Sequence, residues 1–373
     1  MIGAPPPQAG VRDRLAGLDI LTVAAVVGLT IAVTYGLAVL AITLPDVVAS
    51  FPTVGSWAID GHRHLEAAQA VVAGRNPYAI EGFYYSPLGA LSMAPTAALG
   101  PDRGIWLWMA IKLAVLVWCL VDATRGVSIP VRAGILVVGL SSIFVLDDVL
   151  LGNVAIVMAA AIYLAVSRPT AWAAIPLGLL LALVAKPFLV PFLLWMLVFR
   201  RSSALVAMGT GLLATLVGVV ILGFDDYRAY LEALVTAGRT AVPFVGNHGL
   251  TSVNPALLIP ATVVLIAVFG LLLWRSRDES SLLMWSLFAG LVAAPYVGLY
   301  AAVPVFAGVP AFASAHPGRV RVMAALLLPI GLFSIEAAAI LGLLVAFPAD
   351  LLEPVADRLR GMVRTTPPGH DPV

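Results

Sequence analysis

The first long apolar stretch of the chain reads ILTVAAVVGLTIAVTYGLAVLAITL and occupies residues 20–44. It exceeds the ~20 apolar residues that an α-helix needs to cross a bilayer, and it is too long for the apolar core of a cleaved signal peptide. Comparable stretches recur along the chain as far as residue 347. We therefore expect a protein that crosses the membrane many times.

The composition supports the same class. The chain has 373 residues, of which 61% are hydrophobic and 11% are charged, and its mean hydropathy is +1.02. Soluble domains are about 45–50% apolar and about 25% charged, so an ordinary soluble enzyme, a disordered chain and a nucleic-acid binder are excluded. The net charge of +1 identifies no charged partner. A single cysteine, Cys119, leaves no disulfide framework and no thiolate metal site.

We expect an all-α polytopic membrane protein, a helical bundle of roughly 10–12 membrane helices with juxtamembrane helices on its outer face. The candidate apolar segments are 19–44, 84–100, 104–122, 130–147, 152–166, 170–185, 187–199, 203–223, 254–274, 281–299, 301–315 and 320–347. Arginine in short loops marks the cytoplasmic side of a membrane protein. The arginines assigned to that side are Arg12, Arg14, Arg125, Arg132, Arg168, Arg200, Arg201, Arg275, Arg277, Arg319 and Arg321.

Segment 84–100 does not fit this arrangement as a crossing helix. The chain leaves the first span on the outer side and must reach the cytoplasmic side by Arg125, so 84–100 and 104–122 cannot both cross. Segment 84–100 is the shorter of the two and contains Pro87 and Pro95. We expect it to be a juxtamembrane or re-entrant helix on the outer face. Such a segment is tolerated only when it is buried in protein or lines a wet cavity, so an outward-facing cavity is predicted beside residues 45–103.

The remaining organisation follows from composition. Residues 1–350 are predicted to form one integral-membrane domain, followed by a short polar tail at 351–373. Residues 224–253 are expected to be a second large outer loop, which lies with 45–103 on one outer face. Segment 320–347 is interrupted by Pro329 and either spans the membrane or turns back, and the sequence leaves both open.

One carboxylate in the first outer segment is a candidate general base. Residues 57–66 read WAIDGHRHLE, and Asp60, His64 and Ala67 fall on one helical face. Asp60 lies near the start of the expected helix, where the helix dipole stabilises negative charge. A lone carboxylate there is often only a cap, but at the mouth of a membrane-side cavity it can deprotonate a hydroxyl.

Other polar residues are candidate ligands for an anion. Lys186 precedes Pro187 at an expected helix break, and Lys112 lies inside an apolar span. Ionisable groups at membrane depth are costly and tend to be functional, although a lysine can also extend to the interface. His248 belongs to the second outer loop, in the stretch Gly246-Asn247-His248-Gly249. The pair Asp147 and Asp148 could bind a metal, but adjacent carboxylates are more often a solvated helix end.

The order of these features resembles glycosyltransferase family 87, within the C-type membrane glycosyltransferase superfamily, over roughly residues 15–315. The matching motifs are Asp60, Gly74-x-x-Pro77-Tyr78, Tyr85-x-Pro87-Leu88, Gly152-Asn153, Lys186-Pro187, Asn247-His248 and Pro295-Tyr296…Tyr300. The family commonly has Tyr-Pro-Pro where Tyr85-Ser86-Pro87 stands, Gly-Gln in place of Gly152-Asn153, and Asn-Gln-Ser in place of Asn247-His248-Gly249.

The resemblance implies an enzyme in the inner, or plasma, membrane with its active site on the extracytoplasmic face. It implies inverting transfer of a sugar, mannose first, from a polyprenyl-phosphate-sugar donor to a glycolipid or polysaccharide acceptor, with Asp60 as base and no obligatory metal or other cofactor. The residues expected to bind the donor are His248, Lys186, Tyr85 and Arg239. Those expected to bind the acceptor are His64, Asn153 and Tyr300. A transporter of lipid-linked sugars or small molecules, and a non-catalytic subunit of envelope assembly, are the alternatives.

Overall fold

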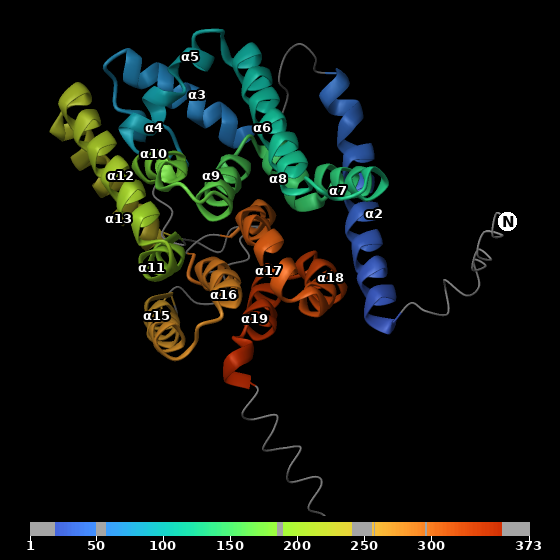
Figure 1. The fold of residues 1–373 in the computed structure, drawn as a ribbon. Helices are drawn as coiled ribbons and strands as arrows, with labels where there is room; N and C mark the ends of the chain where they lie inside the picture. The colour runs from blue at the N-terminus through green and yellow to red at the C-terminus, as the bar shows by residue number, and fades with distance from the viewer. Residues whose placement is uncertain are drawn as a thin grey trace, which may run out of the picture.

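The computed structural model describes residues 19–49, 57–184, 189–240, 256, 258–294 and 297–352, and these residues are helical with no β-strand (Figure 1). The first half comprises α2 (Ile20–Ala49), α3 (Ile59–Val72), η1 (Pro77–Ala79), α4 (Pro87–Ser92), α5 (Ala94–Ala97), α6 (Pro101–Ala123), α7 (Ile129–Ser141), α8 (Ile143–Leu151), α9 (Ala155–Ser167), η2 (Ala171–Ala174) and α10 (Ile175–Leu183). The second half comprises α11 (Val190–Phe199), α12 (Arg201–Leu222), α13 (Phe224–Thr240), α15 (Leu258–Arg275), α16 (Glu279–Val292), η5 (Leu299–Gly308), α17 (Val309–Ala315), α18 (Pro317–Gly331) and α19 (Ile335–Val345).

The helices have the lengths and composition of a polytopic membrane protein. Among the described residues, α2, α6 and α12 are each long and apolar enough to cross a bilayer, and α7 with α8 forms a fourth such unit that is bent by 49°. Shorter apolar helices of 10–17 residues make up most of the remainder. The all-α polytopic fold expected from the sequence is therefore confirmed.

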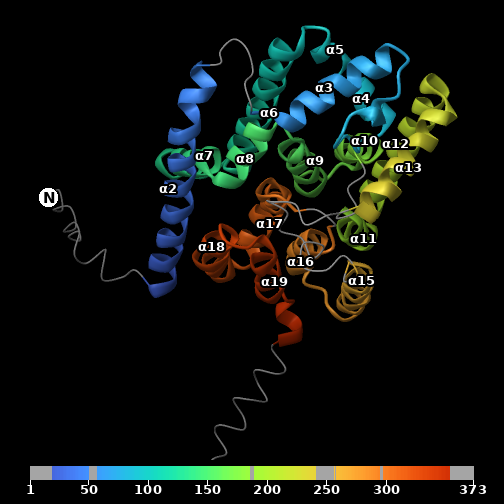
Figure 2. The same ribbon diagram turned by 180° about the vertical axis from the view of Figure 1, so that it is seen from behind.

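The long helix α2 packs through a seam of small residues. Ala25, Gly28, Ala32 and Gly36 are its buried positions, and they recur every three or four residues. Small residues allow membrane helices to approach closely. A Cβ at Gly28 would overlap the backbone carbonyl of Ala324 in α18, and one at Gly36 would overlap the carbonyl of Ser141 at the end of α7. Both views show α2 beside α18 and crossed by α7 (Figures 1 and 2).

A second, smaller core joins the candidate active-site elements at one end of the molecule. In both views α3, α4 and α5 gather beside α6, whereas α15, α16, α18 and α19 lie at the opposite end (Figures 1 and 2). The buried side chains that join α3, α5 and α6 are Ala58, Leu65, Ala68, Met93, Ala97, Ile105 and Met109. This core fixes α3 against α6, which is itself long enough to span the membrane.

Segment 84–100 forms no continuous membrane-crossing helix, as predicted. The Ser86 hydroxyl caps α4 by accepting a hydrogen bond from Gly89 N–H, and Pro87 occupies the first turn. The chain then breaks at Met93 before the four-residue helix α5. Neither helix approaches the ~20 residues required for a crossing. The location of segment 84–100 on the outer face stays a prediction.

The interpretation of residues 224–253 as a loop is wrong for its first half. Residues 224–240 form the amphipathic helix α13, in which Tyr227 and Tyr230 are buried, whereas Phe224 and Leu231 are exposed. The charged residues of this stretch lie on one face of an amphipathic helix, and two acidic residues stabilise its first turn.

The break in segment 320–347 lies beyond Pro329, which is inside α18. The chain turns at residues 332–334, where the Ser334 side chain accepts a hydrogen bond from Ala337 N–H and so caps α19. Helix α19 then packs against α18. Of the two alternatives that the sequence left open, the structure shows two packed helices rather than one continuous span.

The α2 seam gives a stability prediction. We expect Gly28→Ala to lower the melting temperature of the detergent-solubilised protein, because the new methyl group must displace backbone of α18, and overpacking of this kind costs about 1–3 kcal/mol. Gly270→Ala is the matched control, since a Cβ at this glycine within α15 meets nothing within 4 Å. Equal melting temperatures for the two variants would show that α2 does not pack on α18 through Gly28.

Candidate functional site

The first turn of α3 lies directly against the turn that follows α8. Ala58 precedes α3, is fully buried, and has a left-handed backbone with φ of 60°. Its N–H donates to the carbonyl of Leu150 over 2.7 Å. Gly152 has φ of 74°, and a Cβ built on it would lie 2.8 Å from Cα and N of Gly61. Only glycine permits both that backbone conformation and that approach.

This contact brings Asn153 to the carboxylate of Asp60. Asn153 Nδ2 donates to Asp60 Oδ2 over 2.8 Å, and an Arg63 guanidinium nitrogen lies 3.2 Å from Asp60 Oδ1. The Asp60 side chain keeps 24% of its surface exposed. An ionised carboxylate has about four lone-pair sites, so these two donors leave acceptor capacity for a substrate hydroxyl.

The orientation of the Asn153 amide is fixed from its other side. Asn153 Oδ1 accepts hydrogen bonds from Val154 N–H over 2.8 Å and from the Tyr85 hydroxyl over 3.3 Å. Because both partners are donors, the oxygen must face them and the NH₂ group must face Asp60. A chain of hydrogen bonds thus runs from Tyr85 through Asn153 to Asp60.

Tyr85 is kept protonated by its surroundings. Burial raises the pKa of its hydroxyl well above the ordinary value, and the negative charges of Asp60 and Asp148 act in the same direction. His64 stacks on the Tyr85 ring with 4.5 Å between centroids and is buried on the inner side of α3. The phenol therefore serves as a hydrogen-bond donor, held in place by aromatic packing.

A fully buried ion pair lies behind this chain of hydrogen bonds. Lys112 Nζ of α6 is 2.7 Å from Asp148 Oδ2, and neither side chain has any exposed surface. The same nitrogen donates to the Asp148 backbone carbonyl over 2.6 Å. The interpretation of Asp148 as a solvated helix end is therefore wrong, because its charge is balanced inside the protein instead of by water. Lys112 does not extend to an interface.

Asp147 faces a different partner, so the two carboxylates do not converge. Its Oδ2 accepts a hydrogen bond from the backbone N–H of Tyr300 over 3.1 Å. The Tyr300 residue is buried in η5. Within the described ranges, no group of three or more His, Cys, Asp or Glu residues is placed to hold a metal ion.

Four of the predicted site residues come together in the structure, namely Asp60, His64, Tyr85 and Asn153. Tyr300 is linked to them indirectly. Its backbone N–H donates to Asp147 of α8, and α8 ends beside Asn153. Lys186 and His248 lie outside the described residues. Arg239 belongs to α13, but its side chain is outside the described part of the chain. The donor and acceptor roles of all these residues stay predictions.

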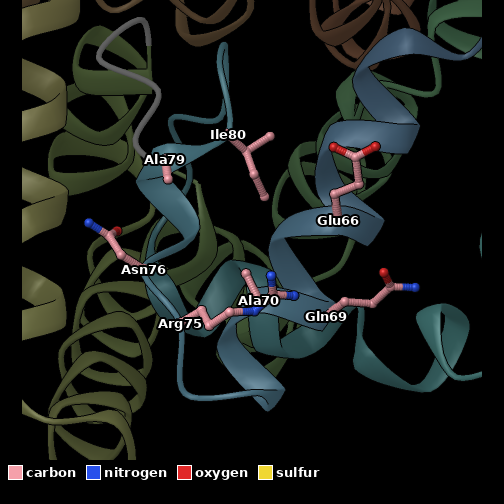
Figure 3. Close-up of a pocket in the computed structure, with 7 residues that line it drawn as sticks. All are labelled: Glu66, Gln69, Ala70, Arg75, Asn76, Ala79 and Ile80. Atoms are coloured by element: carbon pink, nitrogen blue, oxygen red, sulfur yellow. The ribbon is translucent and has the colours of Figure 1, made fainter.

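An open cleft of about 420 Å³ lies beside the second half of α3 (Figure 3). Glu66, Gln69 and Ala70 of α3 form one wall, and the segment from Arg75 to Ile80 forms the other. The Arg75 side chain reaches across toward Ala70, and Ile80 points into the space between the two walls (Figure 3). This cleft lies within residues 45–103, but neither Asp60 nor any residue of segment 84–100 lines it, so the outward-facing cavity expected there stays a prediction.

Sequence reasoning singled out Lys112 but missed its partner Asp148, and it missed Trp108 altogether. Trp108 Nε1 donates to the Gly152 carbonyl over 2.9 Å, and Lys112 lies one helical turn further along α6. The available signal was their spacing of four residues, which places both side chains on one face of the helix. The partnership of Lys112 with Asp148 spans 36 positions and has no local signature.

The comparisons with known proteins identify the family of the chain. The family model of Glycosyltransferase family 87 matches residues 83–328, which is more than half of the chain. The chain belongs to glycosyltransferase family 87. It is a membrane glycosyltransferase, which favours the enzyme over the transporter alternative. No curated protein and no solved structure matches it. The family match includes Tyr85, Asn153 and Tyr300 but begins after Asp60, whose candidacy therefore depends on its contacts with Asn153 and Arg63.

Asn153 gives the sharpest test of the site geometry in this family 87 glycosyltransferase. A hydrogen bond to a charged group contributes about 1.5–3 kcal/mol, so Asn153→Leu is expected to lower kcat about 10- to 100-fold with the fold intact. Asn153→Gln keeps the amide and should retain more activity than the leucine variant. Equal turnover of Asn153→Leu and the unmodified protein would show that the amide does not support the reaction.

Proposed function

We propose that the protein is an inverting glycosyltransferase that uses a polyprenyl-phosphate-sugar, with mannose as the sugar, as its donor. The acceptor is a glycolipid or polysaccharide at the extracytoplasmic face of the plasma membrane. The observation that carries the proposal is the Asp60 carboxylate, which is held by Asn153 and Arg63 yet partly exposed. The membrane fold and the family support a lipid-linked donor, because apolar helices can hold the prenyl chain.

The proposed chemistry is a single displacement at the anomeric carbon. Asp60 takes the proton of an acceptor hydroxyl while that oxygen attacks C1 on the face opposite the phosphate. The C1–O bond to phosphate breaks, and its electron pair leaves with the polyprenyl phosphate. Positive charge spreads over C1 and the ring oxygen in between, as in glycoside chemistry, and the anomeric configuration inverts. One base suffices, because no covalent sugar–enzyme intermediate is formed.

The leaving phosphate is already anionic, so it needs hydrogen-bond donors and positive charge rather than an acid. We propose that Lys186, His248 and Arg239 supply them, with Tyr85 as a further contact. Because a phenol has one proton, Tyr85 makes this contact by exchanging its hydrogen bond to Asn153 for one to the phosphate. The acceptor is proposed to meet His64, Asn153 and Tyr300, and its outlying sugar hydroxyls to use the polar side chains of the cleft beside α3.

Asp60→Asn tests the assignment of the base. It preserves size and removes basicity, so turnover of labelled polyprenyl-phosphate-mannose is expected to fall about 100-fold or more. Asp102→Asn is the matched control, because Asp102 is likewise an acidic residue in the first turn of a helix, α6. The glycosidic linkage formed by the unmodified protein, read by NMR, should have the anomeric configuration opposite to that of the donor. Near-normal turnover in a well-folded Asp60→Asn variant would falsify the assignment of the base.

Lys186→Ala and His248→Ala test the donor site. One positioned donor to a developing anion in a dry site contributes about 2.7–4 kcal/mol, so both variants should lower kcat by two orders of magnitude or more. They should also bind polyprenyl phosphate more weakly, with acceptor KM little changed. Unaltered polyprenyl-phosphate affinity in both variants would place the phosphate elsewhere, with Arg63 and Arg75 the next residues to substitute.

A further inference from the structure

We propose that Trp108 and Lys112 of α6 are positioning residues, which hold the turn between α8 and α9 so that Asn153 meets Asp60. This inference rests on the proposed role of Asp60 as the base. Each of the two side chains acts through its bonds to the turn rather than on the substrate.

The buried ion pair fastens both ends of this turn. Lys112 Nζ binds the carbonyl and the carboxylate of Asp148, in the last turns of α8. The other carboxylate oxygen, Asp148 Oδ1, accepts a hydrogen bond from Ala155 N–H, at the start of α9. The Asp148 carbonyl also accepts from Asn153 N–H over 3.1 Å. Both ends of the turn from 149 to 154 are therefore bonded to Asp148, and Lys112 attaches Asp148 to α6.

Trp108 fastens the middle of the same turn. Its indole N–H donates to the Gly152 carbonyl, and Gly152 is the residue that lies against Gly61 of α3. The Lys112 ammonium lies 6.0 Å from the Trp108 ring centroid, so the two side chains adjoin. From one face of α6 they therefore fix the position of Gly152 and the direction in which the chain enters Asn153.

Stability alone does not account for a charged pair at this depth. Replacing a buried ion pair by well-packed apolar residues is often neutral or stabilising, because desolvation offsets the attraction between the charges. The ion pair does supply direction, since its hydrogen bonds permit one arrangement of the turn. Catalytic groups need such precision, because a displacement of 1 Å can cost about 100-fold in rate.

Trp108→Phe tests the proposal in a double-mutant cycle with Asn153→Ala. Phenylalanine keeps an aromatic ring and removes the N–H, so kcat should fall about tenfold with donor KM changed less than about twofold. If Trp108 acts through Asn153, the double variant should be no slower than Asn153→Ala alone. Independent, multiplicative losses would overturn the proposal.

Trp195→Phe is the matched control. Trp195 is buried and its Nε1 donates to the backbone carbonyl of Glu279 over 3.0 Å, so the substitution removes the same kind of bond between two other helices, α11 and α16. We expect similar losses of melting temperature in the two Trp→Phe variants, but a fall in kcat only in Trp108→Phe. Equal kcat in both would mean that the Trp108 bond is structural only.

The role of Lys112 is tested by a double variant that preserves folding. Lys112→Met alone leaves Asp148 charged and unpaired in the interior, and should fold poorly. The double variant Lys112→Met/Asp148→Asn is neutral and keeps the acceptor for Ala155 N–H, so it should fold while its kcat stays at least about tenfold low. Unmodified kcat in the folded double variant would overturn the role of Lys112. Intact turnover in Asp60→Asn would contradict the proposed function itself. That result is distinguishable from a failure of the positioning role, in which Asp60→Asn is slow but the Trp108 and Lys112 variants are not.

Discussion

The approach of Gly152 to Gly61 is the contact on which the candidate site depends. It lets the first turn of α3 lie on the turn after α8, with a separation that any other residue at 152 would prevent. The hydrogen bond that joins the Asp60 carboxylate to another element passes through this junction, because Asn153 is the next residue. A helix long enough to span the membrane, α6, stands behind the junction and holds it with Trp108 and Lys112. Site geometry is therefore tied to a long helix of the bundle.

The junction also explains how a helix too short to cross a membrane can carry a precisely placed group. Helix α3 has 14 residues, and an isolated helix of that length is marginal in water. Its apolar face is buried by Ile105 and Met109 of α6 and by Met93 beside α5, and its start is fixed by the hydrogen bond from Ala58 to Leu150. The same packing leaves the Asp60 side chain partly exposed. Tertiary contacts rather than helix propensity thus determine where the carboxylate lies.

The sequence was sufficient for the features that depend on local pattern. Apolar length predicted α2, α6 and α12, the two prolines in 84–100 predicted that this segment does not cross, and helical spacing placed Asp60 and His64 together. The sequence could not predict which residues far apart in the chain pair with each other. Asp148 looked like a solvated helix end because its partner is 36 positions away, and α13 looked like a loop although its charges lie on one face of a helix. The contact between glycines has no local signature in the sequence, and the only local signal for Trp108 is its spacing of four residues from Lys112.

We propose above all that Asn153, in the turn after α8, orients Asp60 of α3 toward the site of attack on a lipid-linked sugar. A cryo-electron-microscopy structure in lipid nanodiscs, with a non-transferable polyprenyl-phosphonate sugar bound, tests it most directly. We expect Asp60 to be bonded to the Asn153 amide and to face C1 from the side opposite the phosphorus. A sugar ring bound beyond the reach of Asp60, or an Asp60 carboxylate turned away from Asn153 toward lipid, would contradict the claim.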